Sequence, residues 1–486
     1  MLFPFFVQSQ SSKRFSKLYD YIDFWQVYIA AEELPDQQYF IVGNNAGYWL
    51  SDNFMWVVIL NAEGDTTLDV HISTGDSSVY YLGRQAIIQT QPDFLYIAGT
   101  RSYEDDNIHN GYLMKLTTTG VRLWEKPFAG AKFDALDALV MTANNDLVLA
   151  GTSFSFGDST WGNTYVVKTD TAGELIWQKS LGINNFPERC WSMDTTADGG
   201  CILAGVQGFD SQENIFVIKI DSLGNQKWKK TFGAANGNNF FPRIRALRNG
   251  DFLLTTGLKI STNGSNKAYI TRLSPTGSKM WERYYSSGDL HSLFGFSTEV
   301  FDGSLVSSGA LMEFDANGNY WVLGTLTKID ALGNLLWQRK YYTRHDIDNY
   351  FFSMIPTSDE GFLMYGFAYR PDNYRSDAWV VKVDSLGCLE PGCAGSVAAP
   401  EAEATAVALN IYPNPVAERF TVETPDEPML GLRLCDLSGR VLDDVQFFRQ
   451  YPVREYRLSL AGQPPGVYVL SVRTDKGWVG RKVVKQ

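Results

Sequence analysis

Short apolar runs separated by polar turns recur along most of the chain. Segments such as TYVVKTD and IFVIKID are rich in β-branched residues and are bounded by Gly, Asp and Asn. This pattern is typical of β-strands joined by tight turns. One representative stretch predicts four strands, near Ala135–Met141, Leu147–Gly151, Thr164–Thr169 and Leu175–Lys179. No apolar run reaches the roughly 18 residues that a membrane-spanning helix requires, so no transmembrane span is predicted.

One phrase returns at regular intervals: a basic residue, a turn that ends in Gly, and Trp four residues after that Gly. It reads KLTTTGVRLW, KTDTAGELIW, KIDSLGNQKW, RLSPTGSKMW and KIDALGNLLW, and degenerate copies (ILNAEGDTTL and KVDSLGCLE) flank these five. The turn glycines lie 51 to 56 residues apart and are Gly64, Gly120, Gly173, Gly224, Gly277, Gly333 and Gly387. Glycine suits these turns because it adopts positive φ without a Cβ penalty.

A second marker keeps the same interval, an apolar strand that ends in Gly. Its glycines are Gly43, Gly99, Gly151, Gly205, Gly257, Gly309 and Gly366. Four antiparallel strands in a repeat of this length are typical of a β-propeller blade. Two markers, each found seven times, predict a seven-bladed β-propeller over residues 12–387, with six or eight blades as the alternatives.

The two ends of the repeat region predict how the ring closes. The last repeat has no fourth strand of its own, because Gly387 runs into a Cys-containing Pro/Gly turn. The segment FSKLY (Phe15–Tyr19) echoes WQRKY (Trp337–Tyr341) of the preceding repeat. An N-terminal strand added to the final blade would join the ends and remove two free sheet edges.

The periodic Trp residues have two interpretations. The phrase resembles the tryptophan docking motif of quinoprotein dehydrogenase propellers, in which a similar D-x-x-G-x-x-x-W phrase joins adjacent blades. The resemblance covers that phrase alone, and the metal- and quinone-binding side chains of those enzymes are not evident in this sequence. We therefore interpret the Trp residues as structural, packed between blades, and predict no cofactor.

After Gly387 the composition changes. Residues 388–408 form a small-residue, acidic linker, and residues 409–486 return to alternating strands such as GVYVLSV, which suggest a small β-sandwich. This last stretch resembles the type A C-terminal sorting domain of the type IX secretion system in Bacteroidota. The resemblance rests on four pieces in the expected order, with the residues Tyr412, Pro413, Asn414, Pro415; Asp436, Gly439, Arg440; Gly466, Tyr468; and Lys482.

The resemblance implies an export route. Such proteins cross the inner membrane with a cleavable signal, engage the type IX secretion machinery through this domain, and end secreted or attached to the outer-membrane surface. Residues 1–11 begin MLFPFFV, and we interpret them as the remnant of a signal peptide, with an ordinary hydrophobic N-terminus as the alternative.

Charge and cysteines narrow the class of protein further. The net charge is −12, with 42 basic and 54 acidic residues, and an acidic chain without a basic run is a poor candidate for nucleic acid. Cys388 and Cys393 bracket a Pro-Gly turn and are predicted to form a disulfide, whereas Cys190 and Cys201 are predicted to be buried thiols. No pair has metal-ligand spacing, so no metal site is predicted. The calcium-loop-like start at Asp315 is interpreted as a hairpin turn, because Leu326 stands at the twelfth position.

The loops between the second and third strands of the blades would gather on one face. They carry flat rings and carboxylates, namely Trp49, Tyr103, Phe156, Trp161, Phe209, Tyr369, Tyr374, Asp105, Asp158, Asp210 and Asp372. Rings beside carboxylates suit stacking on sugars or contact with a protein. The alternative interpretation is solvated loop tips with incidental aromatic residues.

No nucleophile motif or phosphate-binding loop is present in the sequence. We therefore predict a non-catalytic module that binds a glycan or a surface protein, or serves as a spacer in a surface complex. The alternative is a carbohydrate-active hydrolase or lyase with a carboxylate pair in the propeller funnel, which sequence spacing would not reveal.

Overall fold

The computed structural model describes residues 13–19, 25–46, 54–76, 78–91, 93–102, 109–157, 160–182, 186–209, 213–232, 239–259, 266–285, 292–314, 320–344, 347–370, 375–390, 409–425, 427–436, 441–446, 453–474 and 477–486. Nearly all regular structure in these ranges is β-strand, apart from one short 3-10 turn, η1 Pro35–Gln37. None of the described residues belongs to a helix of the length and hydrophobicity that crossing a membrane would take.

Strands β2 to β25 form antiparallel runs of four, in which each strand pairs with the next along the chain. The first three runs are β2 Trp25–Leu34, β3 Gln38–Ala46, β4 Phe54–Leu60, β5 Thr66–Ile72; β6 Val79–Gln91, β7 Phe94–Ser102, β8 His109–Thr117, β9 Arg122–Pro127; and β10 Asp134–Met141, β11 Leu147–Ser153, β12 Asn163–Thr169, β13 Leu175–Ser180. The next three are β14 Glu188–Thr195, β15 Cys201–Gln207, β16 Asn214–Ile220, β17 Gln226–Phe232; β18 Asn239–Ala246, β19 Phe252–Lys259, β20 Asn266–Leu273, β21 Lys279–Tyr285; and β22 Ser292–Glu299, β23 Leu305–Phe314, β24 Tyr320–Ile329, β25 Leu335–Tyr341. A last run holds β26 Asp348–Pro356, β27 Phe362–Arg370 and β28 Arg375–Val383.

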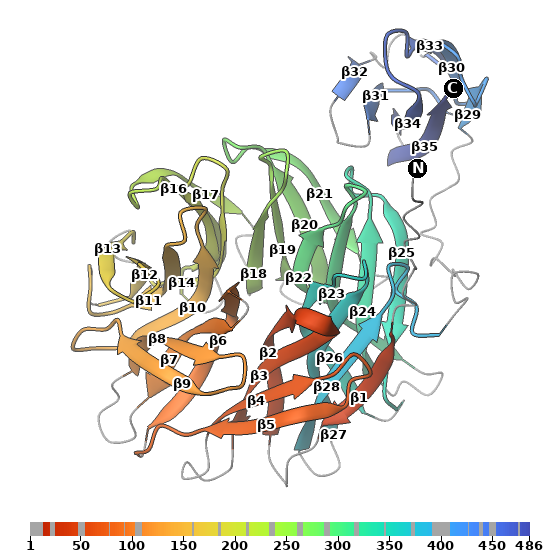
Figure 1. Cartoon of the computed structure of the whole chain (residues 1–486). Coiled ribbons are helices and arrows are strands. Elements are labelled where there is room, and N and C mark those ends of the chain that lie inside the picture. Colours follow the sequence, from red (N-terminus) through yellow and green to blue (C-terminus); the bar gives the residue numbers. More distant parts are fainter. Residues whose placement is uncertain are drawn as a thin grey trace, which may run out of the picture. The chain divides into compact units, whose positions relative to one another are not determined.

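Figure 1 shows these sheets side by side around a ring. The sheets that begin with β6 and β10 meet at their first strands, where Gln85 of β6 forms a single parallel pair with Ala138 of β10. Glycine permits the close approach, because a Cβ at Gly83 would lie 2.5 Å from the carbonyl oxygen of Asp137. Apolar cores therefore form between neighbouring sheets, as where Val148 and Leu203 belong to one buried cluster.

The N-terminal strand β1, Phe15–Tyr19, supplies the missing fourth strand of the last run by pairing with β28. The Phe15 ring lies against Gly64, where an added Cβ would be 2.6 Å from the ring. The Tyr19 hydroxyl donates to the carbonyl of Gly64 at 2.6 Å, and Tyr341 makes the equivalent bond to Gly387 at 2.7 Å. The first and last repeats are thus joined by the same contacts that join neighbouring repeats.

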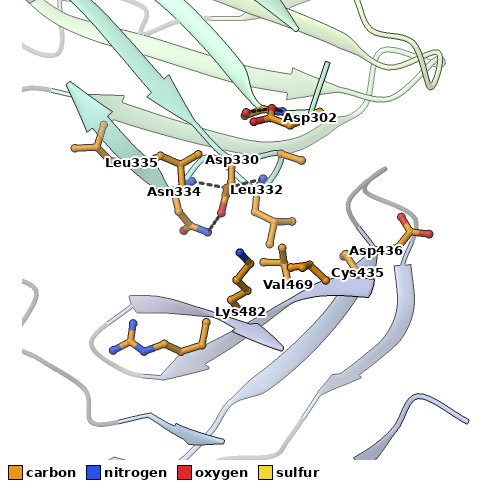
Figure 2. Close-up of a pocket in the computed structure, with 15 residues that line it drawn as sticks. Asp302, Asp330, Leu332, Asn334, Leu335, Cys435, Asp436, Val469 and Lys482 are labelled. Carbon is orange, nitrogen blue, oxygen red and sulfur yellow. Dashed lines mark hydrogen bonds between the residues drawn. The ribbon is translucent and has the colours of Figure 1, made fainter. Parts of the chain in front are cut away.

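In three phrases the Trp packs on the turn glycine of the next phrase: Trp124 on Gly173, Trp177 on Gly224 and Trp228 on Gly277. A Cβ at Gly173 would lie 2.9 Å from Trp124, and one at Gly224 would lie 2.8 Å from Trp177. Both glycines have positive φ, so the turn needs Gly for its backbone and for the space that the indole fills. In a later turn the carboxylate of Asp330 accepts hydrogen bonds from nearby backbone N–H groups, which fixes the turn (Figure 2). These Trp residues are structural.

The basic residue that opens the phrase also has a structural role. In five repeats it pairs with an Asp in the hairpin between the first two strands, in the pairs Lys168–Asp146, Lys219–Asp198, Arg272–Asp251, Lys328–Asp302 and Lys382–Asp359. Burial alone would raise the pKa of the Asp359 carboxyl, but hydrogen bonds from Lys382 and Thr357 outweigh it and lower that pKa. Each pair ties the third strand of a sheet to its first hairpin.

The C-terminal strands form two sheets around one apolar core. The first sheet holds β29 Asn410–Tyr412, β30 Arg419–Glu423 and β33 Glu455–Ser459, and the second holds β32 Val441–Gln446, β31 Gly431–Asp436, β34 Gly466–Thr474 and β35 Gly477–Lys485. Phe420 and Leu458 from the first sheet pack with Leu434, Leu470 and Val483 from the second. The strands of this part pair only with one another among the described residues.

The cysteines divide as the sequence predicts where they are described. Cys190, Cys201 and Cys435 are free and buried, and burial raises the pKa of the Cys201 thiol to about 12. Cys388 is disulfide-bonded. Its predicted partner Cys393 lies outside the described residues, as does the segment that begins at Asp315, so those two interpretations stay predictions.

Candidate functional site

The two ends of the ring of sheets carry different connecting loops. Antiparallel pairing places the beginnings of all first and third strands, and the end of each second strand, at the same end of the ring. We call this the loop end, because the long connections between second and third strands lie there. The predicted ligand-binding residues belong to these connections or to the strand ends beside them.

Trp161 and Phe209 are predicted site residues that the structure brings together. Their rings come from neighbouring sheets and meet edge to face, with centroids 4.8 Å apart. Phe186, before β14, adds a third ring 6.1 Å from Phe209. All three are exposed, at 39, 44 and 48 %. The cluster forms an exposed aromatic surface at the loop end, and its third ring was not predicted because it lies between two sheets.

Other predicted site residues behave differently or are not described. Phe156 stacks on the buried Tyr165 ring at 5.0 Å, which turns it toward the core. Tyr369 is half-buried near the end of β27. The remaining predicted ligand-binding residues lie outside the described part of the chain and stay predictions: Trp49, Tyr103, Asp105, Asp158, Asp210, Asp372 and Tyr374.

A cavity of about 560 Å³ opens at the loop end across the three sheets that begin with β6, β10 and β14. We call it the loop-end pocket. It is lined by Tyr81, Thr100, His109, Phe133, Ala135, Asp137, Thr152, Phe154, Arg189 and Trp191. None of these residues was predicted as a site residue from the sequence. Its volume lies in the range of roughly 300–1,000 Å³ that is usual for small-molecule sites.

Two β-bulges place pocket residues. The register of β10 against β11 shifts between Leu136 and Ala138, and that of β14 against β15 shifts between Cys190 and Ser192. The extra residues are Asp137 and Trp191, and both line the pocket. Because a bulge re-aims the side chain of its extra residue, the alternation of the strand does not predict where these two point.

The rings of the pocket are held by one another. His109 packs on Phe133 with centroids 4.8 Å apart, and Phe133 meets Phe154 edge to face at 5.7 Å. Trp191 meets Phe241 of the next sheet edge to face at 5.2 Å. Burial lowers the pKa of His109, so its imidazole is neutral at pH 7. Tyr81 is 45 % exposed and presents an open ring to a ligand.

The pocket also holds a guanidinium group that no described residue engages. Arg189 is exposed at the start of β14, and its side chain forms no ion pair or hydrogen bond with another described residue. The neighbouring Asp137 is half-buried, and the Thr100 and Thr152 hydroxyl groups are buried in the wall. The pocket therefore combines open rings, acceptors, hydroxyls and one available cation.

A second cavity, of about 490 Å³, lies on the ring axis toward the opposite end. Every first strand from β2 to β26 contributes to its lining, which includes the carboxylates Glu32, Glu33 and Asp194. Glu33 accepts hydrogen bonds from the backbone N–H and the hydroxyl of Ser358 at 2.6 and 2.9 Å. Asp194 accepts one from the Ala246 N–H at 3.0 Å and pairs with Arg245 at 3.4 Å. These two carboxylates hold neighbouring sheets together.

The described residues show no metal centre. They include no group of three or more His, Cys, Asp or Glu side chains that could hold an ion.

In the C-terminal part, the predicted motif residues fix the last strand. The Asn414 side chain donates to the carbonyl of Lys482 at 2.8 Å and accepts from the Val484 N–H at 2.8 Å. The Tyr468 hydroxyl donates to the carbonyl of Pro464 at 2.6 Å. Gly439 and Arg440 lie outside the described residues.

One face of the second C-terminal sheet is set by its register. Cys435 pairs with Val469 on the next strand, and Val469 pairs with Lys482 on the last, so these three side chains share a face (Figure 2). The other motif residues lie at element ends, where Tyr412 closes β29, Asp436 closes β31 and Gly466 opens β34.

Comparison with known proteins identifies the C-terminal part. Residues 410–486 match the family model of the secretion system C-terminal sorting domain. No curated protein matches the chain. The sorting domain implies interaction with the type IX secretion machinery, and the protein is therefore exported, to a secreted or cell-surface location.

Solved structures resemble the ring at low identity. The β-propeller domain of the trilobed protease of Pyrococcus furiosus is 11 % identical over 78 % of this chain and 99 % of its own, with a TM-score of 0.41. The WD40 domain of Toxoplasma gondii coronin is 10 % identical over 76 % of this chain and 87 % of its own, with a TM-score of 0.42. The α-L-arabinanase of Penicillium chrysogenum is 10 % identical over 77 % of this chain and 98 % of its own, with a TM-score of 0.41. At these scores the likeness carries no argument about function. The ring of four-stranded antiparallel sheets in this chain is itself the β-propeller arrangement.

Proposed function

We propose that this chain is a seven-bladed β-propeller of a Bacteroidota cell, over residues 12–387, with a type A sorting domain of β-sandwich form over residues 409–486. The antiparallel runs, with β1 as the last fourth strand, support the blade count. The two sheets around one core support the sandwich. Residues 388–408 are the linker between these two parts.

The export route has a direct test in a host with type IX secretion. Deleting residues 409–486 should leave the protein inside the cells, and the full chain should reach the medium or the cell surface. Equal export of both chains would contradict the assignment.

We further propose that the propeller is a non-catalytic binding module for a glycan or a surface protein. The observation that carries this proposal is the loop-end pocket, where open rings stand beside an Arg with no described protein partner. Two of the carboxylates in the axial cavity already bond neighbouring blades, which disfavours the hydrolase or lyase alternative.

The test uses the full chain on an array of glycans, with outer-membrane proteins as a parallel array. We expect a specific set of spots whose signal falls at least tenfold in Tyr81→Ala. The array signal of Trp161→Ala shows separately whether the aromatic cluster of Trp161, Phe186 and Phe209 contributes to binding. Two blank arrays, or release of new reducing ends from a polysaccharide, would overturn the binding proposal.

A further inference from the structure

We infer that the loop-end pocket takes a sugar that carries a carboxylate, with the Arg189 guanidinium on the acid group and the aromatic side chains on the ring. This inference rests on the proposed binding function and narrows it to one class of ligand, the uronate-containing saccharides.

The rings of the pocket suit a saccharide in shape and rigidity. A pyranose presents a face of C–H groups that packs on flat rings, and aromatic side chains are held here by ring–ring contacts before any ligand arrives. Tyr81 leaves nearly half of its surface to solvent. Because the wall is already ordered, little side-chain entropy is lost when a ligand packs on it.

The charge of the pocket selects an acid group. Arg189 is the permanent cation of the lining, and no described acidic side chain engages it. His109, whose pKa burial lowers, adds no second positive charge at pH 7. A planar guanidinium binds a carboxylate through two parallel hydrogen bonds, which a neutral hydroxymethyl group does not reproduce. Asp137 then faces the hydroxyl side of the ring as an acceptor.

The position of Arg189 is fixed by the backbone of its sheet. A Cβ at Gly205 on the adjacent strand would lie 2.1 Å from the Arg189 carbonyl oxygen, so glycine allows β15 to approach β14 here. The bulge at Trp191 begins two residues later. The guanidinium and the indole therefore enter the same pocket from one strand.

The net charge of the chain does not favour the binding of an anionic ligand. At a net charge of −12 the chain repels polyanions at long range. If uronate binds, a local contact such as that with Arg189 must be the cause, because long-range electrostatic attraction is absent.

The experiment measures the binding of two matched probes to the full chain by calorimetry: trigalacturonate and the neutral galactotriose. We expect the uronate to bind at least tenfold more tightly. Arg189→Gln should weaken uronate binding about 10- to 100-fold and change galactotriose binding less than threefold, the size of loss that a charge-assisted bond predicts. Arg189→Lys should fall between the two, because it keeps the charge and loses the paired geometry.

Arg457→Gln is the matched control. It removes the same charge from a side chain that is 81 % exposed in the C-terminal part, and it should leave both affinities unchanged. Thermal unfolding of each variant confirms an intact fold.

Three results would overturn the inference: equal affinity for the two probes, an unchanged uronate affinity in Arg189→Gln, or no binding of either probe. Equal affinity would leave the proposed function standing, because the pocket would still bind a saccharide. The proposed function itself fails where the glycan and protein arrays are also blank, or where a polysaccharide is cleaved.

Discussion

The buried pair of Lys382 and Asp359 gives a quantitative test of how each repeat is held together. The Lys382 side chain is 0 % exposed and that of Asp359 is 6 % exposed. The ammonium group donates to the two carboxylate oxygens at 2.9 and 2.8 Å and to the Val383 carbonyl at 3.1 Å. Asp359→Asn keeps the side-chain shape but removes the carboxylate that is hydrogen-bonded to the buried ammonium, which leaves only the more distant charges of Glu33 and Asp384. Breaking a buried pair from one side costs about 3–5 kcal/mol, which is our prediction for this variant.

The repeat supplies its own matched control. Asp198 and Lys219 occupy the equivalent positions in another blade and also form a pair, at 2.9 Å, but the Asp198 side chain is 58 % exposed. The Lys219 side chain is 7 % exposed, but water reaches the Asp198 carboxylate and can take its place beside the ammonium group, so Asp198→Asn should cost clearly less than Asp359→Asn. The same atoms change in both variants. The difference between their losses of unfolding free energy therefore measures the effect of burying the carboxylate.

The assay is urea unfolding of the full chain followed by tryptophan fluorescence. All but one of the 13 Trp residues precede residue 409, so the signal reports the propeller. The double variant of Asp359→Asn with Lys382→Met should lose less than the sum of the two single losses. The reasoning is wrong if Asp359→Asn costs no more than Asp198→Asn, or if the two single effects add in the double variant.

Three further outcomes are expected. Phe15→Ala removes the ring that packs on Gly64 and should lower stability by about 3 kcal/mol in the same unfolding assay, because β1 loses its anchor. Gly224→Ala should cost more than 1 kcal/mol by that assay, since φ is +77° and the new Cβ would lie 2.8 Å from Trp177. Burial alone would raise the pKa of Asp198, but hydrogen bonds from neighbouring groups outweigh it and hold that pKa at about 2, below the ordinary 3.8. The stability that ionised Asp198 supplies is therefore present above pH 4 and lost as the pH falls toward 2, so Asp198→Asn should flatten this part of a denaturation-versus-pH curve.

Each of these outcomes has a control. Leu18 is 40 % exposed on the same strand as Phe15, so Leu18→Ala should change stability little. A Cβ at Gly75 would meet nothing within 4 Å at φ +80°, so Gly75→Ala isolates the backbone cost from the clash with Trp. An unchanged pH profile in Asp198→Asn, or a Leu18→Ala loss as large as that of Phe15→Ala, would contradict the corresponding argument.

Much of the fold could be predicted because it is periodic. The Trp phrase returns because an indole packs on the turn glycine of the next blade, as Trp124, Trp177 and Trp228 do. The echo between FSKLY and WQRKY reflects the shared Tyr contacts of β1 and β25. A contact that occurs in several blades requires the same residues in each, so it appears in the sequence as a repeated motif.

No repeated motif marks the residues of the loop-end pocket. Asp137 and Trp191 reach it through bulges that interrupt alternation, and His109, Phe133 and Arg189 come from three different sheets. The sequence predicted aromatic residues in the connecting loops, and two of them do meet, but Phe156 turns inward onto Tyr165. Side-chain direction in a loop depends on the neighbouring blade, which lies about 50 residues away in this repeat.

The most direct test of the account is a crystal structure of the full chain with trigalacturonate. We predict an intact saccharide in the loop-end pocket, with its carboxylate on the Arg189 guanidinium and its ring against Tyr81. A saccharide bound in the axial cavity, or cleaved there beside Glu32 and Asp194, would contradict the account.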